Sequence, residues 1–134
     1  MTRTIRVVLV EDNQVFREAL DMLLSLQDDI DVVASVDNGS DAASVCALHQ
    51  PDVAVIDIGL PGCDGYEVAR QMRDMSDGRA IFLIALTGLS HPDDRRRAVE
   101  AGFDVYLVKP IDPDRLSGLL TSHDGSGPHS LARG

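Results

Sequence analysis

Cysteine, lysine and long apolar runs are all scarce in this sequence, and each scarcity argues against a class of protein. Two cysteines, Cys46 and Cys63, are too few for a disulfide framework and suit a reducing compartment. The sequence has no CxxC or paired His/Cys spacing, which argues against a zinc site. No apolar run approaches the roughly 18 to 20 residues that cross a bilayer, and the first four residues lead into a strand-like run rather than a signal-peptide core. We therefore expect a cytoplasmic protein.

Basic residues are also in deficit. The chain carries 22 acidic residues against 12 basic ones, which gives a formal net charge of -10. This balance disfavours direct binding to nucleic acid, because such binding depends on Lys and Arg to neutralise backbone phosphates. It is compatible with binding a cation or docking on basic partners. Lys109 is the only lysine of the chain, so its position stands out.

Short apolar runs alternate with helix-like segments along the chain. Hydrophobic residues make up 44% of the 134 residues, enough for the core of one domain. We expect strands at residues 5–10, 32–36, 53–56, 81–86 and 105–108, each followed by a helix. This alternation predicts an α/β fold with a five-stranded parallel sheet in a three-layer, doubly wound arrangement. We expect the domain to span residues 1–121 and a flexible tail, rich in Gly, Ser, Pro and His, to span residues 122–134.

Four of the apolar runs end on residues that can handle a cation or a phosphoryl group. These residues are Glu11 and Asp12, Asp57, Thr87 and Lys109. In open parallel sheets, ligands bind in the crevice outside the carboxyl ends of the strands. If the four strands are neighbours, these side chains converge on one edge of the sheet and form a site.

Position along a strand separates Asp57 from the nearby Asp52. The two residues flank the same strand, and five residues at about 3.3 Å each put them roughly 16 Å apart. Asp52 therefore belongs to the opposite edge of the sheet, where we interpret it as a turn residue. Asp57 belongs to the carboxyl edge, beside Glu11 and Asp12 if their strands are adjacent.

Three crowded carboxylates need an explanation. At about 4 Å, two like charges repel by roughly 4 kcal/mol at an effective dielectric constant near 20, so either some carboxyls are protonated or a divalent cation is bound. Oxygen-only ligands with open positions suit Mg²⁺. Glu11 and Asp12 can also serve as helix N-terminal charges, and both interpretations can hold at once. Lys109 could pair with Asp57 in the empty site and with a phosphoryl oxygen in the filled one.

This arrangement resembles the receiver domain of two-component response regulators. The segments that carry the resemblance are Val8–Asp12, Val55–Gly62, Ala85–Gly88, Ala101–Asp104 and Tyr106–Pro110. Each segment alone is a weak signal, but their order and spacing are specific. Together they cover nearly the whole chain, from about Thr4 to Leu120.

The resemblance implies a flavodoxin-like sheet with strand order 2-1-3-4-5. It implies that Asp57 accepts a phosphoryl group from a sensor histidine kinase or a histidine phosphotransfer protein. It further implies Mg²⁺ held by Asp12, Asp57 and the backbone carbonyl of Gly59, with Glu11 acting mainly through water.

The resemblance also implies roles for three other residues. Thr87 and Lys109 would contact the phosphoryl group, and Tyr106 would turn inward when Thr87 moves. We therefore expect a phosphoacceptor that catalyses its own phosphotransfer and dephosphorylation rather than a classical enzyme. Nothing after Leu120 is long enough for an output domain, so we expect a single-domain regulator or a phosphorelay intermediate that acts through contact with a downstream protein partner.

Several alternatives stay open at this point. The chain could be a receiver fragment of a larger regulator or hybrid kinase, or a phosphate-independent scaffold with the same fold. An aspartyl-phosphate hydrolase is disfavoured because Gly59 stands where that chemistry generally needs an acid. A flavin-binding module is disfavoured because the loop after the first strand is acidic. The run Arg95–Arg97 is interpreted as a solvated helix face, with a partner-docking surface as the alternative.

Overall fold

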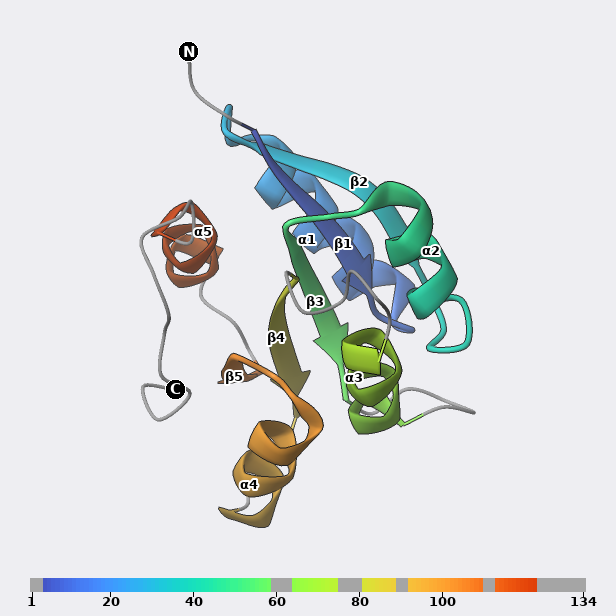
Figure 1. Cartoon of the computed structure of the whole chain (residues 1–134). Helices are drawn as coiled ribbons and strands as arrows, with labels where there is room; N and C mark the ends of the chain where they lie inside the picture. Colours follow the sequence, from blue (N-terminus) through green and yellow to red (C-terminus); the bar gives the residue numbers. More distant parts are fainter. Residues whose placement is uncertain (1–3, 59–63, 75–80, 89–91, 110–112, 123–134) are drawn as a thin grey trace.

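Strands and helices alternate through the chain in the computed structural model, which describes residues 4–58, 64–74, 81–88, 92–109 and 113–122 (Figure 1). The strands are β1 (Ile5–Val10), β2 (Ile30–Val36), β3 (Val53–Asp57), β4 (Phe82–Thr87) and β5 (Val105–Val108). The helices are α1 (Gln14–Ser25), α2 (Ala42–His49), α3 (Gly65–Asp74), α4 (Pro92–Ala101) and α5 (Pro113–Ser122). Each predicted strand is present. The expected tail, apart from Ser122 at the end of α5, lies outside the described residues.

The strands form one parallel sheet in the order β2-β1-β3-β4-β5, which confirms the predicted fold class. β2 begins two residues earlier than expected, because Ile30 pairs with Ile5 and is buried while the exposed Asp31 interrupts the apolar run. Asp57 and Thr87 are the last residues of β3 and β4 rather than the first residues after them. The sheet register therefore fixes the backbone of both.

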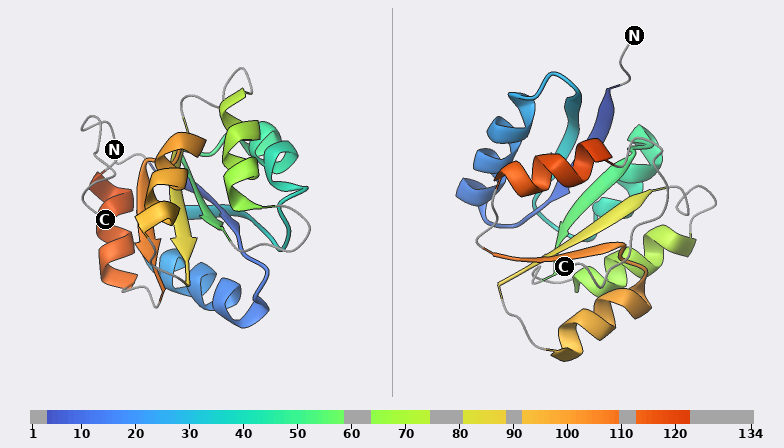
Figure 2. Two further views of the ribbon diagram at one scale, coloured as in Figure 1. Left: turned by 90° about the horizontal axis from the view of Figure 1, so that it is seen from below. Right: turned by 90° about the vertical axis from the view of Figure 1, so that its left-hand side faces the viewer.

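Neighbouring residues of each strand face opposite sides of the sheet and feed two separate core clusters. Val8 and Ala54 belong to a cluster covered by α2, α3 and α4. Val7 and Val53 belong to a cluster covered by α1 and α5. Figure 2 shows these two helix layers on either side of the sheet. Because both faces of the sheet are covered, the strands are apolar throughout, which is why they could be recognised as continuous runs.

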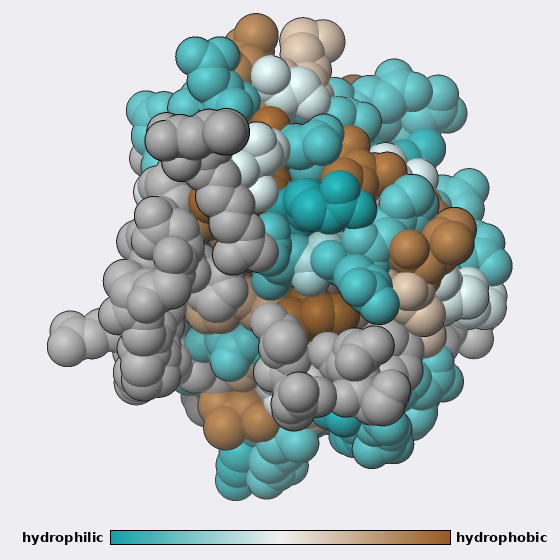
Figure 3. Space-filling view, turned by 45° about the horizontal axis from the view of Figure 1, so that its top comes forward, coloured by the Kyte–Doolittle hydropathy of each residue, from teal (hydrophilic) through white to brown (hydrophobic). Residues whose placement is uncertain are grey.

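The face of the molecule drawn in Figure 3 has a mixed surface rather than a broadly apolar one. Figure 3 shows hydrophobic residues as separate spots among hydrophilic ones on the face that it draws. Among the described helices, none combines the length and the apolar character that a membrane-spanning segment needs. Cys46, on α2, lies in the core, and burial raises the pKa of its thiol to about 12. Cys63 lies outside the described residues.

An arginine clamp joins three elements at the amino edge of the sheet. The guanidinium of Arg73 donates hydrogen bonds to the carbonyl oxygens of Ile81 (2.7 Å) and Gly102 (2.7 and 3.0 Å) and to Asp104 Oδ2 (2.8 Å). The same Asp104 oxygen accepts a hydrogen bond from the backbone N–H of Leu83 at 2.9 Å. Arg73 thereby ties the end of α3 to β4 and to the turn before β5.

We predict that Arg73→Ala lowers the free energy of unfolding by about 2–4 kcal/mol, because it leaves part-buried carbonyls and a carboxylate without their donor. The matched control is Arg70→Ala, on the same helix, whose exposed side chain lies 3.5 Å from Glu67. Exposed pairs contribute less than about 1 kcal/mol. Urea unfolding followed by circular dichroism measures both values, and equal losses in the two variants would contradict the clamp.

Candidate functional site

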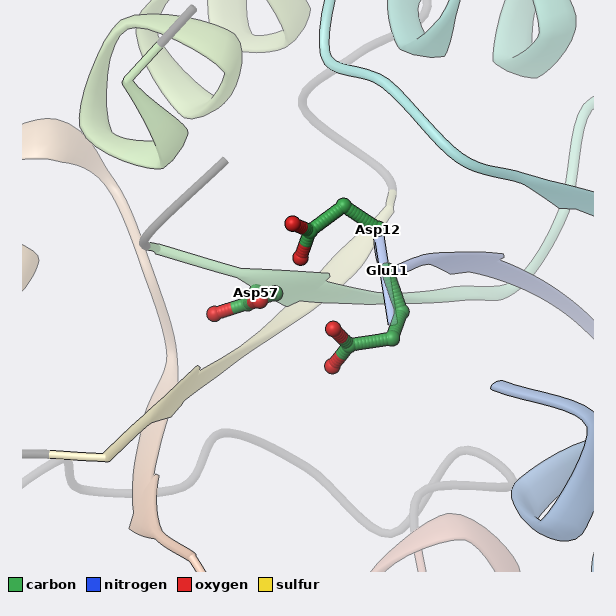
Figure 4. Close-up of side chains that lie close together, drawn as sticks. All are labelled: Glu11, Asp12 and Asp57. Carbon is green, nitrogen blue, oxygen red and sulfur yellow. The ribbon is translucent and has the colours of Figure 1, made fainter. Parts of the chain in front are cut away.

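The carboxyl ends of β1 and β3 bring Glu11, Asp12 and Asp57 together, as predicted. One carboxylate oxygen from each lies within 4.8 Å of the others. Glu11 is 1% exposed and Asp57 6% exposed, whereas Asp12 is open to solvent. Figure 4 shows the side chains of Glu11 and Asp12 leaving the end of β1 in different directions, with Asp57 beside them at the end of β3. The pairing of Val10 with Ile56 in adjacent strands creates this proximity.

Lys109 extends from the end of β5 into the same cluster. Its ammonium nitrogen lies 2.9 Å from Glu11 Oε1 and 3.4 Å from Asp57 Oδ2. The pairing with Asp57 was predicted from the sequence, but the shorter contact with Glu11 was not. Strand order places both residues at one edge, whereas only the side-chain conformations decide which carboxylate is nearer.

Glu11 is held on several sides. Its Oε2 atom accepts a hydrogen bond from the N–H of Asn13 (3.1 Å), and its backbone carbonyl accepts one from Arg17 Nη1 (2.8 Å). Burial raises the pKa of Glu11 to about 7, and the nearby Asp57 acts in the same direction. The hydrogen bonds from Lys109 and Asn13 oppose this shift without cancelling it.

The pKa of Lys109 is raised as well. Burial alone would lower it, but the hydrogen bond to Glu11 and the charges of Asp57 and Glu11 outweigh that effect. The ammonium therefore keeps its positive charge at neutral pH. The site holds a fixed cation beside carboxylates that repel one another.

The cluster fits a hard divalent cation by its chemistry. All the side-chain donors are carboxylate oxygens, and the exposed Asp12 leaves the site open to water. Mg²⁺ is bound in proteins through one or two carboxylates while it keeps several waters. The predicted backbone ligand, Gly59, lies outside the described residues.

Thr87 lies at the end of β4, as predicted, and Tyr106 lies in the neighbouring strand β5. Thr87 is 7% exposed and follows Leu86, the residue paired with Asp57 across the sheet, so its hydroxyl group belongs to the edge that carries the cluster. Its carbonyl accepts a hydrogen bond from the backbone N–H of Lys109 at 2.7 Å. Tyr106 is 2% exposed, so its ring is already turned inward in this structure.

The three arginines at positions 95 to 97 differ from one another, so the interpretation as a solvated face is too simple. Arg96 is exposed and pairs with Asp93. The guanidinium carbon of Arg95 lies 5.6 Å from the ring centroid of Tyr106, and that of Arg97 lies 4.3 Å from the ring centroid of Tyr66. Helical spacing could not reveal these contacts, because the two tyrosines come from other elements.

Asp52 lies away from the site, as predicted. Its Oδ2 atom accepts a hydrogen bond from the backbone N–H of Arg6 at 2.9 Å, and its own N–H donates to the carbonyl of Arg6. Arg6 lies near the start of β1, so Asp52 is a structural residue of the amino edge. Two chemically identical aspartates thus have different surroundings at the two ends of β3.

The raised pKa of Glu11 predicts a pH dependence of stability in the metal-free protein. Because the folded-state pKa of about 7 exceeds the ordinary value of 4.5, the folded state binds the proton more tightly than the unfolded state. The stability that this group contributes is fully present below pH 4.5 and is lost as the pH rises through about 7. We predict a lower urea midpoint at about pH 8 than at about pH 5.5 in EDTA, and a smaller difference in Glu11→Gln.

The control for this measurement is Glu18→Gln. Glu18 is exposed on α1 and accepts a hydrogen bond from Gln14. In Glu18→Gln, the difference between the urea midpoints at the two pH values should equal that of the wild type. A Glu11→Gln variant with the full wild-type pH dependence would contradict the assignment.

Comparison with known proteins agrees with this geometry. The family model described as "Response regulator receiver domain" matches residues 7–121. The chain is 35% identical over 118 residues to the transcriptional regulatory protein DesR of Bacillus subtilis. That alignment covers 88% of this chain but 57% of DesR, so the chain spans little more than half of that regulator.

Solved structures give the same result. The signal receiver domain of NarL from Mycobacterium tuberculosis superposes with a TM-score of 0.83 at 29% identity, covering 92% of this chain and 98% of that one. The receiver domain of the sensor histidine kinase PA1611 from Pseudomonas aeruginosa superposes with a TM-score of 0.79 at 30% identity, covering 88% and 95%. The latter structure is described as having a magnesium ion coordinated in its active-site cleft. The family match, the fold and the acidic site at the strand ends show that this chain belongs to the response regulator receiver domain family, whose members are signalling proteins.

Proposed function

We propose that Asp57 is the phosphoacceptor of this receiver domain and takes its phosphoryl group from a phosphohistidine of a sensor histidine kinase or a phosphotransfer protein. The observation that carries the proposal is the position of the Asp57 carboxylate at the end of β3, beside both the ammonium of Lys109 and the acidic pair Glu11 and Asp12. A carboxylate in that position can act as a nucleophile while its neighbours control the charge around it.

The proposed reaction is an in-line transfer. A carboxylate oxygen of Asp57 forms a bond to phosphorus, the phosphorus–nitrogen bond of the donor breaks, and its electron pair stays on the imidazole nitrogen. Lys109 then offsets negative charge on the phosphoryl oxygens, and the hydroxyl of Thr87 donates a hydrogen bond to one of them. The protein therefore catalyses its own modification by positioning and electrostatics, without being a classical enzyme.

We propose that Mg²⁺ is the cation of the site, held by Asp12 and Asp57 and by the backbone carbonyl of Gly59, with Glu11 acting through water. When bound, Mg²⁺ neutralises charge on the phosphoryl oxygens. Three carboxylates against one ammonium leave a formal excess of two negative charges (three minus one) when all are ionised, which a divalent cation matches. Glu11 is less suited to direct binding than Asp12, because its two oxygens already accept hydrogen bonds from Lys109 and Asn13.

The proposed switch links the site to the surface through Thr87 and Tyr106. Thr87 pairs with Val108 across the sheet, and the buried Tyr106 lies two residues before Val108 in the same strand. A phosphoryl group that draws the Thr87 hydroxyl towards it therefore changes the space beside the Tyr106 ring. The guanidinium of Arg95 lies over that ring, so α4 is in contact with the switch residue. A two-state change of this kind can alter the face presented to a downstream protein.

The wider context of the domain is also part of the proposal. We propose that the output is contact with a protein partner, without direct binding to nucleic acid, in the cytoplasm. The acidic net charge of -10 supports the first two points. DesR, a transcriptional regulatory protein, is longer than this chain, so the proposal does not include the function of the part of DesR outside the alignment.

We predict that Asp57→Asn abolishes phosphorylation by acetyl phosphate in the presence of Mg²⁺, because an amide oxygen is a much weaker nucleophile than a carboxylate. Intact-mass spectrometry measures the added phosphoryl group. The matched control is Asp52→Asn, which changes the same residue type at the other end of β3 and should be phosphorylated like the wild type.

Two outcomes would contradict this proposal. A wild-type chain that gains no phosphoryl mass from acetyl phosphate or a phosphorylated kinase would favour the phosphate-independent scaffold. An Asp57→Asn variant that is still phosphorylated at the wild-type rate would place the acceptor elsewhere. Circular dichroism of each variant establishes that it is folded.

We predict that Asp12→Asn weakens Mg²⁺ binding by about tenfold or more, because a charged oxygen ligand is replaced by a neutral one. Isothermal titration calorimetry measures the affinity directly. Asp31→Asn, at an exposed position on β2, is the control and should bind Mg²⁺ as the wild type does. Equal affinities in Asp12→Asn and the wild type would remove Asp12 from the metal site.

A further inference from the structure

The ammonium of Lys109 has an aromatic neighbour in addition to its two carboxylates. Its nitrogen lies 4.6 Å from the ring centroid of Phe16, within the roughly 6 Å at which a cation is attracted to the face of an aromatic ring. The Lys109 side chain is 25% exposed, so water only partly screens this attraction. Phe16 follows the acidic pair by a few residues, on the first turn of α1.

Phe16 is held by hydrogen bonds of its helix turn and by packing against the core. The backbone N–H of Phe16 donates a hydrogen bond to the N-cap residue, Asn13 Oδ1, at 3.0 Å. The next residue, Arg17, donates to the backbone carbonyl of Glu11 at 2.8 Å. The ring itself is partly buried against the core cluster beneath α1 and α5. The first turn of α1 is therefore tied to the end of β1, which places the Phe16 ring beside the site.

Ligands of the site compete for the carboxylate partners of Lys109 but not for its aromatic partner, Phe16. Glu11 and Asp57 hold Lys109 through oxygen atoms, and a phosphoryl group on Asp57 or a cation at the cluster competes for those oxygens. The face of Phe16 offers no oxygen, so neither ligand displaces it. A lysine side chain has a flexible four-carbon stem, and a partner that persists throughout the reaction restricts it.

We propose that Phe16 is a positioning residue for phosphoryl transfer to Asp57. Its ring keeps the ammonium of Lys109 within reach of the incoming phosphoryl oxygens. It does so both before and after the phosphoryl group and the cation take up the carboxylate oxygens. This inference rests on the proposed function, and it assigns to α1 a part in the reaction that the residues of the strand ends do not supply.

The test separates the aromatic face of Phe16 from its bulk. Phe16→Leu and Phe16→Met keep an apolar side chain of similar size without a π face, whereas Phe16→Tyr keeps the face. Val15→Ala is the control for the first turn of α1, since Val15 is 79% exposed. We expect the rate of phosphorylation by acetyl phosphate, at saturating Mg²⁺, to fall about fivefold in the Leu and Met variants. The Tyr and Val15→Ala variants should stay within about twofold of the wild type.

A second readout does not depend on activity. Because Lys109 is the only lysine, selective ¹³C labelling of lysine gives a single set of side-chain signals in an NMR spectrum. The ring current of Phe16 should shift the Lys109 ε-proton signal upfield in the wild type and in Phe16→Tyr. That shift should be absent in Phe16→Leu and Phe16→Met, while the affinity for Mg²⁺ stays within about twofold of wild type, because the metal ligands are unchanged.

The outcomes are distinct. An unshifted lysine signal in the wild type, or a wild-type rate in both Phe16→Leu and Phe16→Met, overturns the inference and leaves phosphorylation of Asp57 standing. A Mg²⁺ affinity that falls in step with the rate also overturns it, since Phe16 would then shape the whole site. If the wild type accepts no phosphoryl group, the proposed function fails first, and the NMR signal still reports whether the ring contacts Lys109.

Discussion

Electrostatic crowding at the carboxyl edge of the sheet is the constraint on which the rest of the site depends. Glu11 and Asp57 are almost fully buried, and a third carboxylate, Asp12, lies within 4.8 Å of them. The ammonium of Lys109 contacts Glu11 and Asp57 and offsets only part of that charge. Because the fold holds these groups together, the charge must be relieved by a proton on Glu11 or by a cation. The proposed Mg²⁺ would relieve this charge and also offset the negative charge of an incoming phosphoryl group.

The fold can hold this unfavourable edge because its stability lies elsewhere. Two apolar clusters, one on each face of the sheet, contain the buried hydrophobic residues of the described part of the chain, and their burial stabilises the fold. At the amino edge, Arg73 joins α3 to the turn before β5 and to β4 through well-placed hydrogen bonds. The chemistry is thus confined to the carboxyl edge of the sheet. The charged residues at that edge lie at or just after the ends of the strands and are not part of the two apolar clusters.

Much of the arrangement could be predicted because it follows from strand direction. Continuous apolar runs identified the strands, and parallel order placed the residues after them at one edge, which also separated Asp57 from Asp52. The contact of Arg95 with Tyr106, the ring of Phe16 beside Lys109 and the clamp made by Arg73 could not be predicted in this way. Each joins residues from different elements through long side chains, and neither periodicity nor spacing carries information about where such side chains end.

By itself, the sequence determined which residues reach the functional edge, since hydrophobic periodicity and chain direction decide where each parallel strand stops. Only the tertiary structure decided how those residues are paired. Lys109 lies nearer to Glu11 (2.9 Å) than to Asp57 (3.4 Å), and a ring from α1 covers its ammonium. Pairing depends on differences of a few tenths of an ångström between side chains with several rotamers each, and these are set by packing among residues far apart in the chain.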